Sequence, residues 1–152
     1  MHYWLMKSEP DTFGIDDLRA RPKQTEHWDG VRNYQARNML RDQMKKGDLA
    51  FFYHSNCKEP GIVGIVEIVR QAYPDSTALD PENPHFDPKS TPEAPRWYMV
   101  DVRFRERFKR TITLAELKNH RALAELILLR KGNRLSIMPI SAAAWRYILK
   151  LE

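Results

Sequence analysis

The sequence predicts an α+β fold, built on a small, mostly antiparallel sheet or barrel with helices at its periphery. Short segments with strand-like patterns recur along the chain, and short helical patterns lie between them. The two kinds of segment do not alternate in the regular strand–helix–strand order of a parallel α/β fold. At 152 residues, the chain fits one domain with a real core, so we expect a single domain over residues 1–152.

The first part of the chain predicts one strand followed by two helices. Residues 3–7 have the pattern of a strand, which Ser8-Glu9-Pro10-Asp11 ends. A brief helix over residues 15–21 is closed by Pro22. Helix-forming residues over 34–44, with apolar side chains near one stripe, predict an amphipathic helix that ends at Gly47.

The middle of the chain supplies the strands that we expect at the centre of the sheet. Residues 49–53 and 61–72 are strand-like, and the run from Ile62 to Val66 is apolar on both faces, as in a buried central strand. Residues 97–108 alternate clearly, which puts Trp97 on a polar face beside several arginines. The opposite face of this strand is the predicted core face, with Tyr98, Val100, Val102, Phe104 and Phe108.

Residues 73–95 predict a long surface loop without regular structure. They hold six of the ten prolines and five acids against one base, a net charge of −4. The rest of the chain therefore carries +9, an uneven basic charge that favours polyanions as partners. We expect this basic surface around the binding site, with the acidic loop to one side or acting as a flap.

The last part of the chain predicts helices around one strand. Thr113 and Glu116 match a capping box that opens a helix to about residue 119. One or two helical turns follow over 122–129, and a last strand over 135–140 precedes a C-terminal helix capped by Ser141.

Composition excludes several classes of protein. The content of 42% hydrophobic and 30% charged residues is that of a soluble globular protein. No run approaches the ~18 apolar residues of a membrane helix, and we find no secretory signal. The lone Cys57 excludes an internal disulfide and fits a reducing, cytoplasmic location. With one Cys and scattered histidines, we expect no metal and no cofactor, and we expect a monomer.

The segment Trp28-Asp29-Gly30-Val31-Arg32-Asn33 is the strongest candidate site. Asp-Gly allows a sharp bend with φ > 0 at Gly30, which would gather the neighbouring side chains around one small volume. There Trp28 can stack on a planar base, Arg32 can meet a phosphate and Asn33 can read a base edge. In the alternative, Trp28 is core, Arg32 braces Asp29 or Glu9, and Asn33 caps the next helix.

Four motifs occur in order along the chain: WLMKSEP at 4–10, WDGVRNYQARN at 28–38, YHSN at 53–56 and RLS at 134–136 before Pro139. With these motifs the whole chain resembles the EVE domain family, and we expect its compact prokaryotic form. The resemblance implies a PUA-like pseudo-barrel of about five or six strands. It also implies kinship with domains that bind RNA or modified bases, and hence a pocket for a modified base on one side of the barrel.

Together, the motifs and the resemblance define a set of candidate ligand-binding residues. Trp28, Trp97 and either Tyr34 or Tyr53 are candidate walls. His54 is expected to orient its loop through a hydrogen bond. Arg134 either buttresses the pocket or forms a surface ion pair. The full set is Lys7, Ser8, Trp28, Gly30, Arg32, Asn33, Tyr53, His54, Ser55, Trp97 and Arg134.

The function that these features predict is that of a nucleic-acid-binding module that reads a modified base flipped into an aromatic pocket. The partner is RNA or DNA. One alternative is an enzyme acting on a modified nucleoside, such as a hydrolase, because Lys7, Ser8 and Glu9 supply an amine, a hydroxyl and a carboxylate. Another is an RNA-binding domain that ignores modification. We assign no catalytic residue.

Overall fold

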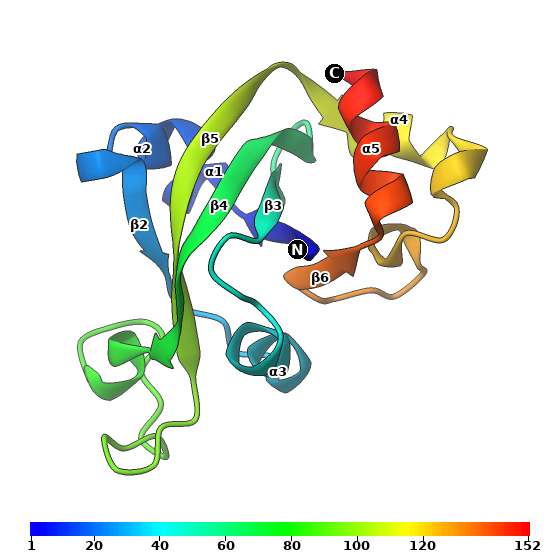
Figure 1. The fold of residues 1–152 in the computed structure, drawn as a ribbon. Helices are drawn as coiled ribbons and strands as arrows, with labels where there is room; N and C mark the ends of the chain where they lie inside the picture. Colours follow the sequence, from blue (N-terminus) through cyan, green and yellow to red (C-terminus); the bar gives the residue numbers. More distant parts are fainter.

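The computed structural model describes residues 1–152 and has a six-stranded sheet at its centre, in the order β2-β5-β4-β3-β1-β6 (Figure 1). The strands are β1 (Tyr3–Ser8), β2 (Thr25–Trp28), β3 (Leu49–His54), β4 (Gly61–Pro74), β5 (Tyr98–Thr113) and β6 (Ile137–Ile140). The α-helices are α1 (Pro10–Phe13), α2 (Ile15–Arg19), α3 (Tyr34–Asp42), α4 (Leu114–Lys118) and α5 (Ala142–Leu151). Short 3-10 turns are η1 (Pro22–Gln24), η2 (Ser76–Leu79), η3 (Arg121–Leu123) and η4 (Ile127–Leu129).

Four of the five strand pairings are antiparallel, which confirms the mostly antiparallel sheet. The exception is the parallel pair β1–β3, with Tyr3 opposite Leu49 and Ser8 opposite His54. The connection between these two strands contains α1, α2, β2 and α3. Because β2 lies within this connection, the sequence pattern does not have the regular strand–helix–strand order that indicates a parallel pair. The long strands β4 and β5 curve together through the molecule, and the sheet stays open as a pseudo-barrel (Figure 1).

Both faces of the sheet are covered, each by its own hydrophobic cluster. Alternate residues of β3 show this division: Ala50 and Phe52 belong to one cluster, Phe51 and Tyr53 to the other. Residues of α2 and α3 join the first cluster, and residues of α4 and α5 join the second. In Figure 1, α1 and α2 accordingly lie on the opposite side of the sheet from α4 and α5. The predicted burial of both faces between Ile62 and Val66 is confirmed.

Local sequence signals set the ends of the helices. The side chains of Asn33, Thr113 and Ser141 each accept a hydrogen bond from a backbone N–H in the first turn of the following helix. Only one of the two hydrogen bonds of the predicted capping box forms at α4. The Thr113 hydroxyl accepts from the Glu116 N–H, but the Glu116 side chain pairs with Arg110 and does not bond to the Thr113 N–H. These caps confirm the predicted starts of α3, α4 and α5.

The segment at 73–95 lacks regular structure over most of its length, as predicted. β4 continues to Pro74, and η2 is the one helical turn in the segment. β5 runs five residues beyond the predicted end at Phe108. Met99, which the alternation placed on the polar face of β5, is buried, so the face prediction is wrong at this position.

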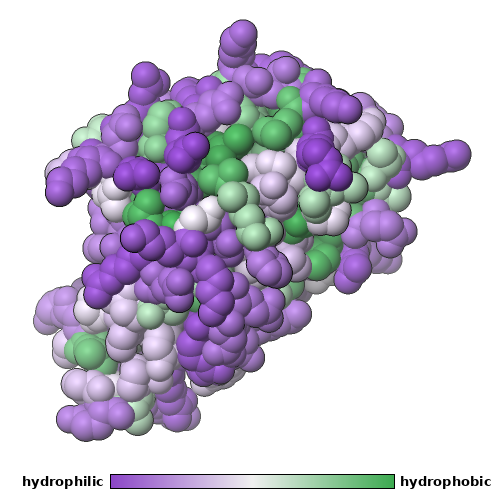
Figure 2. Space-filling model, in the orientation of Figure 1, coloured by the Kyte–Doolittle hydropathy of each residue, from purple (hydrophilic) through white to green (hydrophobic).

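The surface is mostly hydrophilic on the face in Figure 2, with hydrophobic residues in limited patches. None of the helices combines the length and the hydrophobicity needed to cross a membrane.

We predict that Gly64→Ala strongly destabilises the protein. A Cβ at this position would overlap the Glu106 carbonyl oxygen of β5 and the Ile15 side chain, because β4 and β5 shift register here. Overpacking of this kind costs about 1–3 kcal/mol or more. Chemical denaturation measures the loss. Gly14→Ala is the control, since its Cβ would have no neighbour nearer than 3.4 Å. Equal midpoints for the two variants would contradict the prediction.

Candidate functional site

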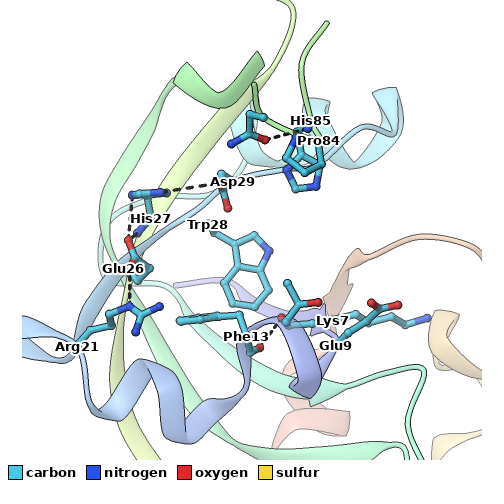
Figure 3. Close-up of a pocket in the computed structure, with 14 residues that line it drawn as sticks. Lys7, Glu9, Phe13, Arg21, Glu26, His27, Trp28, Asp29, Pro84 and His85 are labelled. Carbon is cyan, nitrogen blue, oxygen red and sulfur yellow. Dashed lines mark hydrogen bonds and ion pairs between the residues drawn. The ribbon is translucent and has the colours of Figure 1, made fainter. Parts of the chain in front are cut away.

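The largest depression is a cleft of about 600 Å³ that contains Trp28 (Figure 3). We call it the Trp28 cleft. It lies between the end of β1, the start of α1, strand β2 and the tip of the long loop. Its lining residues are Lys7, Ser8, Glu9, Thr12, Phe13, Arg21, Glu26, His27, Trp28, Asp29, Gly30, Asn83, Pro84 and His85.

Trp28 is the last residue of β2, and its ring stands at the centre of the cleft in Figure 3. Only 7% of the residue is exposed. Phe52 and Phe13 meet the indole ring in edge-to-face geometry, with centroids 5.4 and 6.5 Å away. Trp28 therefore belongs to the first core cluster and also lines the cleft. Trp28 lines the cleft, as predicted. The prediction that it is not part of the core is wrong.

Lys7, Ser8 and Glu9 form the side of the cleft at the end of β1. Burial lowers the pKa of Lys7 below its ordinary value. The Ser8 hydroxyl donates to the Phe13 carbonyl oxygen over 2.6 Å, which fixes the chain between β1 and α1. Glu9 accepts a hydrogen bond of 2.8 Å from the Asn56 side chain. The Lys7 ammonium lies 5.8 Å from the centroid of the Tyr53 ring, toward the second cluster, so the Glu9 carboxylate is the charged group that this side offers to a ligand.

The opposite side of the cleft carries paired charges from β2 and its surroundings. Arg21 lies 2.8 Å from Glu26, and Glu26 also accepts from the His27 N–H. Burial alone would raise the pKa of Glu26, but these two donors hold it below its ordinary value. The His27 ring lies 3.9 Å from Asp29. Three carboxylates face two bases in the lining, so the expected basic surface around the site is not found in the cleft itself.

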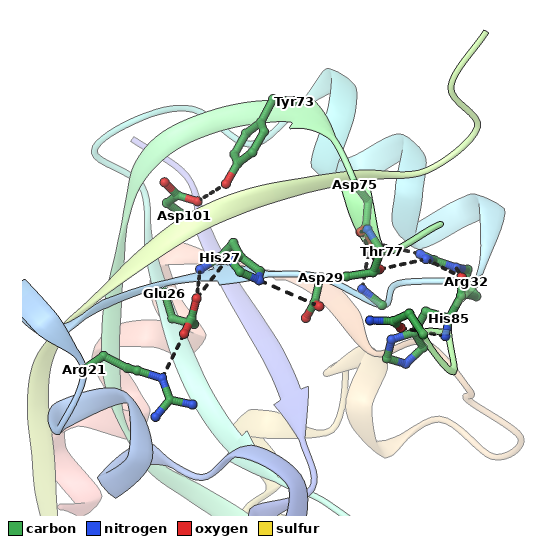
Figure 4. A network of polar contacts seen from close by, with 12 residues as sticks. Arg21, Glu26, His27, Asp29, Arg32, Tyr73, Asp75, Thr77, His85 and Asp101 are labelled. Atoms are coloured by element: carbon green, nitrogen blue, oxygen red, sulfur yellow. Dashed lines mark hydrogen bonds and ion pairs between the residues drawn. The ribbon is translucent and has the colours of Figure 1, made fainter. Parts of the chain in front are cut away.

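One buried carboxylate, Asp75, ties the long loop to the turn after β2 (Figure 4). Its oxygens accept bonds from the Gly30 N–H at 2.8 Å, the Thr77 N–H at 2.8 Å and Arg32 at 3.1 Å. The Thr77 hydroxyl adds a fourth donor. Burial alone would raise the pKa of Asp75, but these hydrogen bonds lower it overall, so the group is ionised at neutral pH.

Arg32 is part of this connection. Besides Asp75, its guanidinium donates to the His85 carbonyl oxygen at 2.8 Å and to the Thr77 hydroxyl at 3.2 Å. Arg32 is therefore an internal brace, as the alternative held, but its partner is neither Asp29 nor Glu9. The Arg32 guanidinium, which we expected to contact a phosphate, is instead hydrogen-bonded to groups of the protein.

Gly30 has φ +79°, as predicted for the bend, and it lies directly against the loop tip. A Cβ at this position would come within 2.6 Å of the His85 ring. The bend thus lets the His85 imidazole close one end of the Trp28 cleft. Of the two positions expected for the acidic loop, the structure has its tip, residues 83–85, in the lining of the cleft.

Trp97 anchors the loop and does not line the Trp28 cleft. It is 5% exposed, and its indole N–H donates to Asp87 over 2.7 Å. Its ring stacks on Tyr34 at 4.7 Å, with the Arg32 guanidinium 5.3 Å from its centroid. The pocket-wall prediction for Trp97 is wrong, because the loop folds back over the face of β5 that alternation had assigned to solvent.

Asn33 and Tyr53 are also outside the cleft. The Asn33 amide oxygen caps α3 by accepting from the Ala36 N–H at 3.0 Å, which is the alternative that the sequence offered. Tyr53 is buried in the second cluster, on the other face of the sheet. Neither residue is a wall or an edge reader of the cleft.

His54 and Ser55 support the cleft from behind. The His54 Nε2 atom accepts the Ile15 N–H at 3.1 Å, which agrees with the predicted orienting role. Burial, and then Arg107, lowers the pKa of His54 and so favours the neutral ring that can accept this bond. The Ser55 N–H donates to the Ser8 carbonyl oxygen at 3.0 Å. Arg134 is exposed and forms neither a buttress of the cleft nor an ion pair.

Sequence reasoning missed Phe13 and the loop tip with Pro84 and His85 as lining residues. The acidic composition of the loop argued against a place in a nucleic-acid-binding site, so its tip was not among the predicted residues. The positive φ predicted for Gly30 was the one available signal, because it indicates that another part of the chain approaches closely there.

Comparison with known proteins identifies the family. The model of the EVE domain matches residues 2–151, so this chain belongs to the EVE domain family. Human thymocyte nuclear protein 1 is 52% identical over 167 residues, covering 99% of this chain and 73% of that protein.

Two solved structures have nearly the same fold. A Pseudomonas syringae protein matches with a TM-score of 0.94 and 53% identity, over 98% of both chains. The human protein in complex with DNA containing 5-methylcytosine matches with a TM-score of 0.95 and 49% identity, over 99% of this chain and 97% of that one.

We predict that Asp75→Asn lowers stability at neutral pH by about 1–3 kcal/mol, because four donors lose a charged acceptor. Since the folded-state pKa lies below the unfolded value of about 3.9, the contribution of Asp75 is complete above that value and is lost as the pH falls through the folded-state pKa.

Denaturation from about pH 7 to about pH 3 checks this, with Glu93→Gln as the control for an exposed loop carboxylate. The difference between wild type and Asp75→Asn should shrink toward acid pH. A difference that is constant across this range would contradict the prediction.

Proposed function

We propose that this protein binds DNA carrying 5-methylcytosine and holds the modified base, flipped out of the duplex, in the Trp28 cleft. The observation that carries the proposal is the indole of Trp28 at the centre of an open cleft, in a fold nearly identical to that of a human relative complexed with such DNA. RNA as a second partner, a monomeric state and a cytoplasmic location are further expectations that rest on the sequence alone.

Apolar and aromatic groups in the cleft suit the base and its methyl group. Trp28 and Phe13 line one region of the cleft and the His85 ring closes another, so a flat ligand meets π surfaces from both directions. Stacking on an aromatic side chain contributes about 1–3 kcal/mol per base. A buried methyl group adds about 0.8 kcal/mol, which gives a few-fold preference over cytosine.

Polar groups of the cleft suit the edge of cytosine. The base offers an amino donor and ring acceptors on its Watson–Crick edge. Asp29 and Glu9 provide carboxylate acceptors for the amino group. The mixed charge of the lining thus suits a neutral base better than a phosphate.

An enzyme that acts on a modified nucleoside is the second candidate, because Glu9 lines the cleft and burial lowers the pKa of Lys7 at the end of β1. Incubation with 5-methyl-2′-deoxycytidine and with methylated DNA separates the two functions. Turnover that Lys7→Ala abolishes would replace the binding function by catalysis.

We predict that Trp28→Leu weakens binding to methylated DNA by about 1–3 kcal/mol, because the stacking surface is lost. The variant also loses stability through the core, by less than the ~3–5 kcal/mol of a truncation to Ala. Trp145→Leu is the matched control, since Trp145 is 4% exposed but lies in the second cluster.

Affinity is measured well below the melting temperatures of both variants. Trp145→Leu should lose stability and keep its affinity. An equal loss of affinity in both variants would show that Trp28 acts through folding alone, and the proposed stacking would be wrong.

We predict that His85→Ala weakens the same binding by about 0.5–1.5 kcal/mol, the range of one aromatic contact, without loss of stability. His85 is exposed at the loop tip, and its backbone oxygen, which holds Arg32, is unchanged by the substitution. Phe86→Ala is the control, because Phe86 is the exposed neighbour outside the cleft. An unaltered affinity of His85→Ala would remove the loop tip from the site.

A further inference from the structure

A second depression, of about 340 Å³, lies between the start of α3 and the segment 130–135. We call it the Arg130 depression. Arg130, Lys131 and Arg134 line it, and no acidic residue does. This contrasts with the Trp28 cleft, where carboxylates outnumber bases. The Arg130 depression therefore has the charge that the sequence predicted for a nucleic-acid-binding surface.

The three bases of this depression are free of carboxylate partners. Elsewhere many exposed arginines are paired, as Arg105 is with Glu67 and Arg110 with Glu116. Arg130, Lys131 and Arg134 are all exposed, and none takes part in a salt bridge. Their charge is thus available to a ligand, and an anion would not have to displace a protein carboxylate.

Backbone and amide donors at the depression add to this charge. Asn33 and Gln35, at the start of α3, are part of the lining, and the first turn of the helix holds no acid. The Asn33 side chain caps the Ala36 N–H, while the Gln35 N–H has no protein acceptor. The positive end of a helix with a free N–H favours anions.

Asn133 has one unsatisfied polar atom. Its amide oxygen accepts from the Leu135 N–H at 3.2 Å, and its buried amide nitrogen has no hydrogen-bond partner. An unpaired buried donor is costly. Asn133 belongs to the segment that lines the depression.

The depression adjoins the Trp28 cleft through the backbone. The Lys7 N–H, at the cleft, donates to the Ser136 carbonyl oxygen at 2.8 Å, two residues after Arg134. On the other side, Gly30 is three residues before Asn33, a span of at most about 10 Å.

We propose that the Arg130 depression seats a backbone phosphate of the strand whose modified base occupies the Trp28 cleft. This assignment rests on the proposed function. The cleft would read the base, whereas the depression would hold the strand without regard to sequence. Division of these tasks explains why the basic residues lie beside the cleft and not in it.

The test is a triple variant, R130Q/K131Q/R134Q, compared with R121Q/R146Q/K150Q. The control removes three exposed, unpaired bases at η3 and α5, so the two variants have the same net charge. Affinities are measured over a range of salt concentrations for a methylated DNA duplex, for the same duplex unmodified and for 5-methyl-2′-deoxycytidine, which has no phosphate.

We expect R130Q/K131Q/R134Q to bind methylated DNA about tenfold or more weakly than the control variant. The slope of log affinity against log salt should be shallower by about 1 for each phosphate that the variant no longer neutralises. Affinity for the nucleoside should be unchanged. A variant that binds both duplexes like the control, with the same salt slope, would overturn the phosphate seat.

The failure of the proposed function has a different result. If the wild type binds both duplexes equally, methylcytosine reading is wrong, and a selective loss of affinity for both in R130Q/K131Q/R134Q would still support the phosphate seat. If the wild type binds neither duplex at low salt, both proposals are overturned.

Discussion

The ionised, buried carboxylate of Asp75 is the interaction on which the shape of the cleft depends. A charge in this position is stable only when donors surround it, and the Gly30 N–H, Thr77 and Arg32 meet that need. Because these donors come from both the turn after β2 and the loop after β4, the carboxylate joins two segments far apart in the sequence. This connection also holds Arg32, which donates to the His85 carbonyl oxygen, and so fixes the loop tip at the cleft.

The acidic composition of the long loop has a structural explanation. The Asp75 carboxylate accepts hydrogen bonds within the fold. The Asp87 carboxylate accepts hydrogen bonds from the Trp97 indole N–H and the Lys89 N–H, which lower the pKa of Asp87. Two of the loop's five acids thus hold the loop in place. Arg32 offsets the charge of Asp75, so part of the segment's net charge of −4 is balanced within the fold. Asp87 keeps its charge, because both of its donors are neutral.

Much of the fold could be predicted from local patterns, because caps such as Ser141 and the apolar run from Ile62 to Val66 report on their own surroundings. The site could be predicted only in part. The sequence placed Trp28, Gly30, Lys7 and Ser8 near one another, but it could not show which distant segment covers them. Trp97 illustrates the limit: its strand alternation was sound, yet a loop that folds back turned a solvent face into a buried one.

Trp28 serves the hydrophobic core and the cleft with one side chain. In the proposed function, a substitution at this position therefore changes folding and ligand preference at once. Residues 83–85 line the cleft but belong to neither core cluster, because they lie on an irregular loop. In the proposed function, a new base preference can arise at the loop tip without a change in the core, whereas a substitution of Trp28 alters the core as well. The same asymmetry recommends the loop tip as the place to engineer selectivity for other modified bases.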